Sequence, residues 1–223
     1  MSRLDSIAER ARRGERLDGV LVIDAHAHLG DSYMFPITNH DGAGMLRSLD
    51  RLGVATTCIS GIVGAVGTDF RRGNDQVVEC VRSFPGRYFG YSVVYPHRPE
   101  GAAPEVERCA ALGLRALKIH SVHGKSYTAK EYLPAYAIAD ARGFPVLAHT
   151  WGNKELGQIR ELAQQYKRIN WIAAHAGSQD WDTYVKIARE LPNVFLELCC
   201  SMCGRGWVER FVKEAGAEKV LYG

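Results

Sequence analysis

The chain has 223 residues, of which 46% are hydrophobic and 24% charged, and its formal net charge is +3. This composition is typical of a globular protein, and the spread of lysines and arginines along the chain gives no support to a nucleic-acid-binding surface. No apolar run reaches the ~18 residues that a membrane span requires, so we expect no membrane partner.

The first 19 residues mix acidic side chains with arginines and lack an apolar centre, which fits neither a secretory signal nor a transit peptide. We expect residues 1–19 to form a charged helical extension ahead of one domain that covers residues 20–223. Several of the six cysteines fall within apolar patterns, which indicates reduced thiols and a cytoplasmic location.

Eight short apolar runs alternate with longer helical patterns, which predicts βα units around a parallel sheet. The expected strands are residues 20–28, 54–60, 88–96, 114–120, 144–150, 170–177, 193–199 and 219–223. The expected helices are residues 41–53, 74–86, 104–113, 130–143, 153–166, 180–192 and 206–219. This order favours an α/β fold, a (β/α)8 TIM barrel, with an open doubly wound sheet as the structural rival.

The first expected strand closes with two histidines, in the stretch VLVIDAHAHLG at residues 20–30. Successive side chains of a strand leave opposite faces, so His26 and His28 share one face, with Asp24 one step deeper. Two imidazoles on one face can hold one metal ion. A buried Asp24 needs a partner, so we expect its carboxylate to support the two histidines from beneath.

Later strands also carry chemically active residues at their carboxyl ends, where the loops of a barrel form the catalytic face. These are Lys118 and His120, then His149, then His175. A single histidine at a strand end is more often structural than a ligand. A pair at i and i+2, joined by histidines that end two later strands, instead favours a metal site.

The ordered motifs IDAHAHLG, N-x9-FPGRYFG, GLRALKIH, PVLAHT, WIAAHAG and AEKVLYG resemble the amidohydrolase-2 branch of the metal-dependent amidohydrolase superfamily. The resemblance runs from about residue 20 to the last residue and implies a (β/α)8 barrel. It implies that His26, His28 and His149 bind one divalent metal ion, zinc by expectation and manganese as the alternative. His175 would then act as acid or base on metal-activated water or on the substrate.

The resemblance also bears on the fourth strand. In binuclear relatives a carboxylated lysine on this strand bridges two metals, whereas the ALKIH context of the amidohydrolase-2 branch favours one metal. We therefore expect Lys118 or His120 to orient the substrate.

Two tryptophans and a cysteine pair have competing interpretations. Trp151 and Trp181 each follow a histidine-ending strand, so they either wall a substrate pocket or pack between helices or at an interface. Trp151 is the one we expect to bind substrate. Cys200 and Cys203 form a single CxxC without a second pair, which favours a structural or incidental role.

The family pattern continues after the eighth-strand glycine with Thr or Ser and then Asp, a metal ligand and often the general base. This sequence ends at Gly223, so we expect a barrel truncated within its eighth strand. Three explanations compete for the missing Asp. The sequence is a fragment of a longer enzyme, which is the explanation we favour, or it is complete and its activity is impaired. In the third, another carboxylate takes the place of the Asp. Glu197 is the best substitute, because its alternate neighbours Val194, Leu196 and Leu198 are apolar and its own side chain should point inward.

Three functional hypotheses follow. The first is a hydrolase that uses metal-activated water on a small carbonyl compound, namely a lactone, amide or ester. The alternative is a metal-dependent non-oxidative decarboxylase of an aromatic or unsaturated carboxylic acid, with Lys118 or an arginine as the cation for the carboxylate. The third is an inactive, truncated barrel. The expected partner is a small-molecule substrate, and a homodimer is expected only from the general frequency of twofold assemblies.

Overall fold

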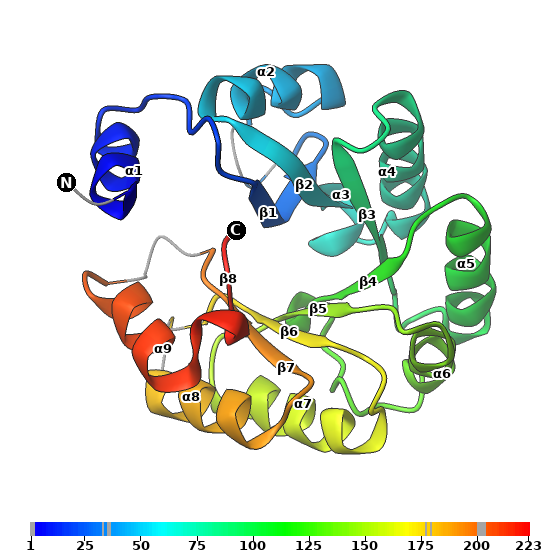
Figure 1. Cartoon of the computed structure of the whole chain (residues 1–223). Coiled ribbons are helices and arrows are strands. Elements are labelled where there is room, and N and C mark those ends of the chain that lie inside the picture. Colours follow the sequence, from blue (N-terminus) through cyan, green and yellow to red (C-terminus); the bar gives the residue numbers. More distant parts are fainter. Residues whose placement is uncertain (1–2, 33, 35–36, 177, 179, 200–203) are drawn as a thin grey trace.

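The structure is a computed structural model that describes residues 3–32, 34, 37–176, 178, 180–199 and 204–223. Eight parallel strands follow one another in sequence order around a nearly closed barrel, with helices on the outside (Figure 1). The strands are β1 (Val22–Leu29), β2 (Val54–Gly61), β3 (Tyr88–Val93), β4 (Ala116–Ile119), β5 (Val146–His149), β6 (Trp171–Ala174), β7 (Val194–Glu197) and β8 (Val220–Leu221). The predicted TIM barrel is therefore confirmed.

The helices match the predicted order, with differences at their ends. They are α1 (Arg3–Arg12), α2 (Gly42–Leu52), α3 (Ile62–Ala65), α4 (Phe70–Ser83), α5 (Pro99–Ala111), α6 (Leu133–Arg142), α7 (Asn153–Gln165), α8 (Trp181–Glu190) and α9 (Trp207–Ala215), with 3-10 turns η1 (Ser121–His123) and η2 (Ala217–Lys219). Helix α4 begins earlier than predicted because the Asp69 carboxylate accepts a hydrogen bond from the Arg72 backbone N–H and caps the helix. Helix α5 begins earlier at a proline, which suits a first turn.

The core has an outer and an inner part. Leu117 and Ile119 of β4 belong to the outer cluster, which packs the strands against the surrounding helices. The inner cluster contains Tyr91, Ala116 and Leu147. Ala116 and Leu147 precede or follow outer-cluster residues along their strands, so their side chains leave the opposite face. All residues of β4, β5 and β6 are buried, which explains why these strands appear in the sequence as continuous apolar runs.

The barrel is least regular where β1 and β8 meet. The backbone N–H of Ala25 donates to the carbonyl of Tyr222 at 2.8 Å, so β1 is hydrogen-bonded to the segment after β8. Figure 1 shows this end of the chain near the barrel axis, whereas α1 lies outside the barrel between α2 and α9. The pairing of β1 with β2 is irregular between Asp24 and Ala27, on either side of His26.

Among the described residues, no helix combines the length and the apolar character needed to cross a membrane. Cys58, Cys80 and Cys109 carry thiols rather than disulfides. The pair Cys200 and Cys203 lies outside the described residues.

Candidate active site

Five imidazole rings gather at the carboxyl ends of β1, β4, β5 and β6. The ring centroids of His120 and His149 are 3.8 Å apart, those of His149 and His175 4.6 Å, those of His175 and His26 5.0 Å, and those of His26 and His28 5.1 Å. Each ring therefore contacts the next in a continuous series at the barrel mouth. The strand-end positions correctly indicated that these histidines would lie together.

His26 lies between two buried charged groups. Its Nδ1 is 2.8 Å from Oε2 of Glu197, and Lys118 Nζ is 2.9 Å from its Nε2. A carboxylate only accepts hydrogen bonds and an ammonium only donates them. His26 therefore donates from Nδ1 to Glu197 and accepts at Nε2 from Lys118. All three residues are buried, and the inward direction predicted for Lys118 and Glu197 agrees with these contacts.

The Glu197 carboxylate joins three strands. Besides His26 Nδ1–H, it accepts the backbone N–H groups of His175, at 3.4 Å, and of Cys199. His175 has a left-handed backbone with φ of 61°, which a residue with a side chain adopts only when its surroundings hold it there. The His175 Nδ1 donates to the carbonyl of Cys199, so its Nε2 is the nitrogen available to a substrate.

His28 and Asp24 are held by residues of β2. Nδ1 of His28 is 3.0 Å from the Ser60 hydroxyl. The Asp24 carboxylate accepts the backbone N–H of His26 at 2.9 Å and the Thr57 hydroxyl at 2.6 Å, so it supports the β1 backbone beneath the histidines. Ser60 was missed from the sequence, although its place at the end of an apolar run was a usable signal.

His149 has an unsatisfied ring nitrogen. Its Nε2 is buried and has no hydrogen-bond partner among the described residues, while its carbonyl accepts the Tyr127 hydroxyl at 2.6 Å. A buried imidazole nitrogen without a partner is costly, and a metal ion is one group that would satisfy it. The neighbouring His120 accepts the Val122 backbone N–H at Nδ1, at 3.1 Å, which leaves its Nε2–H as a donor.

Burial keeps the imidazoles of this cluster neutral. It is the main cause that lowers the pKa of each member below its ordinary value: His26, His28, His120, His149 and His175. Burial also lowers the pKa of Lys118 to about 8, an effect that the Glu197 carboxylate opposes. Burial raises the pKa of Glu197. Neutral imidazoles are the form that binds metal ions.

The most compact set of potential ligands differs from the predicted set. Among the described residues, ligand atoms of His26, His175 and Cys199 lie within 4.8 Å of one another. The resemblance implied His26, His28 and His149, which the structure brings to the same mouth, and their role as the ligand set stays a prediction. Cys199 had no role in the sequence predictions, and its only signal was the cysteine-rich stretch CCSMC.

The two tryptophans have different surroundings. Trp151 is 43% exposed, lies parallel to the His175 ring at a centroid distance of 5.4 Å, and meets the His149 ring at 69°. It therefore stands at the mouth beside the histidine cluster, and its contact with a substrate stays a prediction. Trp181 packs against the outer core under the Arg210 guanidinium, which fits the helix-packing interpretation.

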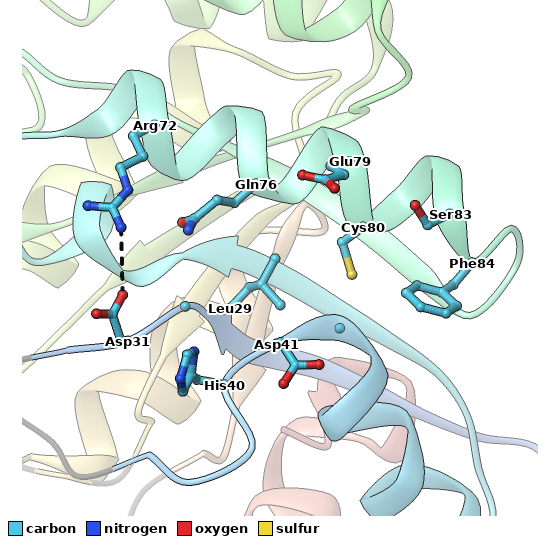
Figure 2. Close-up of a pocket in the computed structure, with 12 residues that line it drawn as sticks. Leu29, Asp31, His40, Asp41, Arg72, Gln76, Glu79, Cys80, Ser83 and Phe84 are labelled. Carbon is cyan, nitrogen blue, oxygen red and sulfur yellow. Dashed lines mark ion pairs between the residues drawn. The ribbon is translucent and has the colours of Figure 1, made fainter.

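A separate cavity of about 440 Å³ lies between β1, α4 and the segment that precedes α2 (Figure 2). Arg72 and Asp31 face one another at its side, with 4.0 Å between their charged atoms. Leu29 lines this cavity, and it leaves β1 on the face opposite to that of His28. None of the predicted site residues lines this cavity, so it is distinct from the histidine cluster.

Comparisons with known proteins place the chain in a family. Residues 23–223 match the family model described as Amidohydrolase. A comparison with curated protein sequences found no match.

Several solved structures share the fold at low sequence identity. A 5-carboxyvanillate decarboxylase from Sphingomonas paucimobilis has a TM-score of 0.71 and 16% identity, with 91% of this chain and 88% of that chain covered. A 4-oxalomesaconate hydratase from Rhodopseudomonas palustris has a TM-score of 0.68 and 16% identity, covering 91% and 81%. A dihydroxybenzoic acid decarboxylase from Polaromonas, solved with manganese and the inhibitor 2-nitroresorcinol, has a TM-score of 0.68 and 17% identity, covering 91% and 85%.

Proposed function

The chain belongs to the amidohydrolase family, and from this premise we propose that it is a metal-dependent, non-oxidative decarboxylase of a planar aromatic or unsaturated carboxylic acid. The observation that carries the proposal is the pairing of a buried cation, Lys118, with neutral imidazoles beside the exposed ring of Trp151. The carboxylate of such a substrate would pair with the Lys118 cation, and its conjugated ring would stack on the flat Trp151 ring. The decarboxylases among the structural neighbours support this choice over the hydrolase.

In this proposal, His26, His28 and His149 would hold the divalent ion through their Nε2 atoms, as the family resemblance implies. Nδ1 is already engaged by Glu197 in His26 and by Ser60 in His28, and Nε2 of His149 has no partner in the part of the chain that the structure describes. When bound, the ion would polarise an oxygen of the substrate. Manganese is supported by the neighbour that contains it, and zinc remains a candidate because imidazole is a good ligand for it.

The remaining residues have distinct roles in the proposed reaction. The Trp151 ring offers a face to the substrate, and the Nε2–H of His120 donates to a substrate oxygen. Nε2 of His175 takes up a proton and delivers it. The bond between the substrate carbon and its carboxylate breaks, the electron pair stays on that carbon, His175 protonates it there, and carbon dioxide leaves.

A hydrolase of a lactone, amide or ester is the second candidate. His175 favours it, because the same Nε2 that protonates carbon can accept a proton from water. The likeness to a hydratase, whose reaction adds water, also favours it.

The test begins with metal content. We expect the purified protein to bind about one equivalent of manganese or zinc and the His26→Ala/His28→Ala double variant to bind none. The loaded protein is then given 2,6-dihydroxybenzoate, 5-carboxyvanillate and related acids, and carbon dioxide release is measured. We expect release to stop on chelation and to fall at least about a hundredfold in His175→Asn.

His40→Asn is the matched control, because His40 lines the separate cavity of Figure 2 and should leave activity unchanged. A metal-loaded protein that hydrolyses lactones or esters and releases no carbon dioxide would replace the decarboxylase by the second candidate. A loaded protein without either activity would favour the non-catalytic barrel.

A further inference from the structure

The contact between Lys118 and His26 has a consequence for metal binding. Lys118 Nζ lies 2.9 Å from Nε2 of His26, and His26 has no second lone pair because its Nδ1–H is donated to Glu197. A metal ion binds an imidazole nitrogen at about 2.0–2.1 Å through this same lone pair. The lysine ammonium and the metal therefore cannot both bind His26.

We propose that Lys118 is a built-in competitor of the divalent metal ion. In the metal-free protein its ammonium occupies the lone pair of His26, and it leaves that position when the metal binds. This inference rests on the proposed function, because it requires His26 to be a metal ligand.

A purely structural ion pair would be the simplest other role for Lys118, and the contacts argue against it. Among the described residues, no ion pair within 4.0 Å joins Lys118 to Glu197. The Glu197 oxygens are instead occupied by His26 Nδ1–H and by two backbone N–H groups. Within the described part of the chain, the one hydrogen bond of the Lys118 ammonium is to Nε2 of His26, the proposed ligand nitrogen.

Charge balance explains why such an exchange suits this site. Glu197 is fully buried, and a buried carboxylate needs positive charge nearby. Lys118 supplies that charge without metal, and a divalent ion would supply it after exchange. The flexible four-carbon stem of lysine allows Nζ to turn from His26 toward the substrate space, where the ammonium could pair with a substrate carboxylate.

The test measures binding of Zn²⁺ and Mn²⁺ alone, by calorimetry on the full chain after chelation. Lys118→Met keeps the side chain as far as Cε and removes the competing ammonium, so we expect its metal Kd to be at least about tenfold lower than that of the wild type. Lys118→Gln keeps a neutral donor for His26 and should lie between the two. The control is Lys219→Met, because Lys219 lies before β8 at the opposite end of the barrel, where its Nζ donates to the carbonyls of Leu191, Pro192 and Val194 and lies over the Phe195 ring.

A second readout needs no variant that could fail to fold. In wild-type protein with 15N-labelled lysine and histidine, saturating Zn²⁺ should shift the Lys118 Nζ signal and the His26 Nε2 signal together. A Lys118 signal that stays unchanged while His26 binds zinc would overturn the inference.

The outcomes separate the inference from the proposed function. Tighter binding in Lys118→Met, or binding in this variant alone, supports the inference. Equal or weaker binding in Lys118→Met, with normal binding in the wild type, overturns the inference and leaves the proposed metal enzyme intact. No binding in any of the folded proteins overturns both.

Discussion

Glu197 shows how one side chain can organise a whole site. Its carboxylate accepts hydrogen bonds from His26 Nδ1 and from the backbone of His175 and Cys199, so it fixes a proposed metal ligand and the proposed proton carrier together. A carboxylate behind a ligating histidine sets which ring nitrogen faces the metal. In the proposed site, Glu197 would therefore act as a positioning residue rather than as a ligand.

Glu197→Gln should weaken metal binding without unfolding the protein. A neutral amide holds the His26 Nδ1–H less strongly, and losses of this kind reduce metal affinity by about 10- to 100-fold. Calorimetric Kd values for Zn²⁺ and Mn²⁺, with circular dichroism as the check on folding, would measure the effect. Glu79→Gln, an exposed change on α4, is the control. Unchanged affinity in folded Glu197→Gln would contradict the positioning role.

The sequence predicted directions at this scale but not partners. Strand alternation correctly placed Lys118 and Glu197 inside the barrel, because apolar residues occupy the alternate positions. It could not predict that Lys118 would contact His26, which is 92 residues away, because that contact depends on the curvature of the closed barrel. The support of His28 by Ser60 depends on strand pairing in the same way.

At the scale of elements, Asn74 ties α4 to β3 and α5. The residue is fully buried, accepts the Val93 backbone N–H at 2.7 Å, and donates to the Val93 carbonyl at 3.3 Å and to Glu105 at 3.0 Å. Asn74 opens the motif N-x9-FPGRYFG, which carried part of the family resemblance. These contacts explain the asparagine of the motif: it holds α4 against β3 and α5.

Asn74→Ala should lower the free energy of unfolding by about 3 kcal/mol, because several buried hydrogen-bonding groups lose their partner at once. Urea unfolding of wild type and variant would measure this loss. Arg82→Ala, an exposed change on the same helix, should stay within about 0.5 kcal/mol of the wild type. A similar loss in both variants would show that Asn74 has no special role.

Glu105 adds a pH-dependent contribution to the same contact. Burial acts to raise the pKa of Glu105, but hydrogen bonds from Arg108 and Asn74 outweigh it, and the folded pKa is lowered. A carboxylate whose pKa is lower in the folded protein contributes its full stabilisation at pH values above the unfolded pKa of about 4.3. This stabilisation is lost as the pH falls through the folded pKa. Glu105→Gln should therefore be less stable than the wild type at neutral pH.

The difference between Glu105→Gln and wild type should shrink as the pH falls below about 4, where the wild-type carboxylate takes up its proton. Denaturation midpoints across this range would follow it. A difference that grew toward acid pH would contradict the assigned direction of the pKa shift.

Element boundaries show what local patterns can and cannot predict. Runs such as residues 144–150 predicted buried strands because parallel strands with both faces covered are apolar throughout. The short helix α3 and the turn η1 were missed, because three or four residues carry no helical periodicity. Their positions follow from the chain turning at the barrel mouth.

At the scale of the whole molecule, stability should vary around the barrel. The strands β4, β5 and β6 are buried throughout, whereas Ile23 of β1 is 48% exposed and both residues of β8 are only partly buried. Because protection from hydrogen exchange follows burial and pairing, amides of β1 and β8 should exchange fastest among the strands and those of β5 and β6 slowest.

Metal binding should reduce the difference in hydrogen-exchange protection between β1 and β5. The proposed ligands His26 and His28 belong to β1, the irregular strand at the meeting point with β8, whereas His149 belongs to β5. An ion held by all three would connect the least protected strand to one of the most protected strands. The binding free energy would then oppose any opening that separates β1 from β5.

We therefore expect Zn²⁺ to slow amide exchange in β1 more than in β5, as measured by hydrogen exchange with mass spectrometry on metal-free and loaded protein. The His26→Ala/His28→Ala variant should show no such change, because its β1 no longer reaches the ion. Equal protection of all strands would show that the ion acts on global stability alone. Protection confined to β6 and β7 would instead favour a site built on His175 and Cys199 without β1, and would contradict the ligand set on which the proposed function depends.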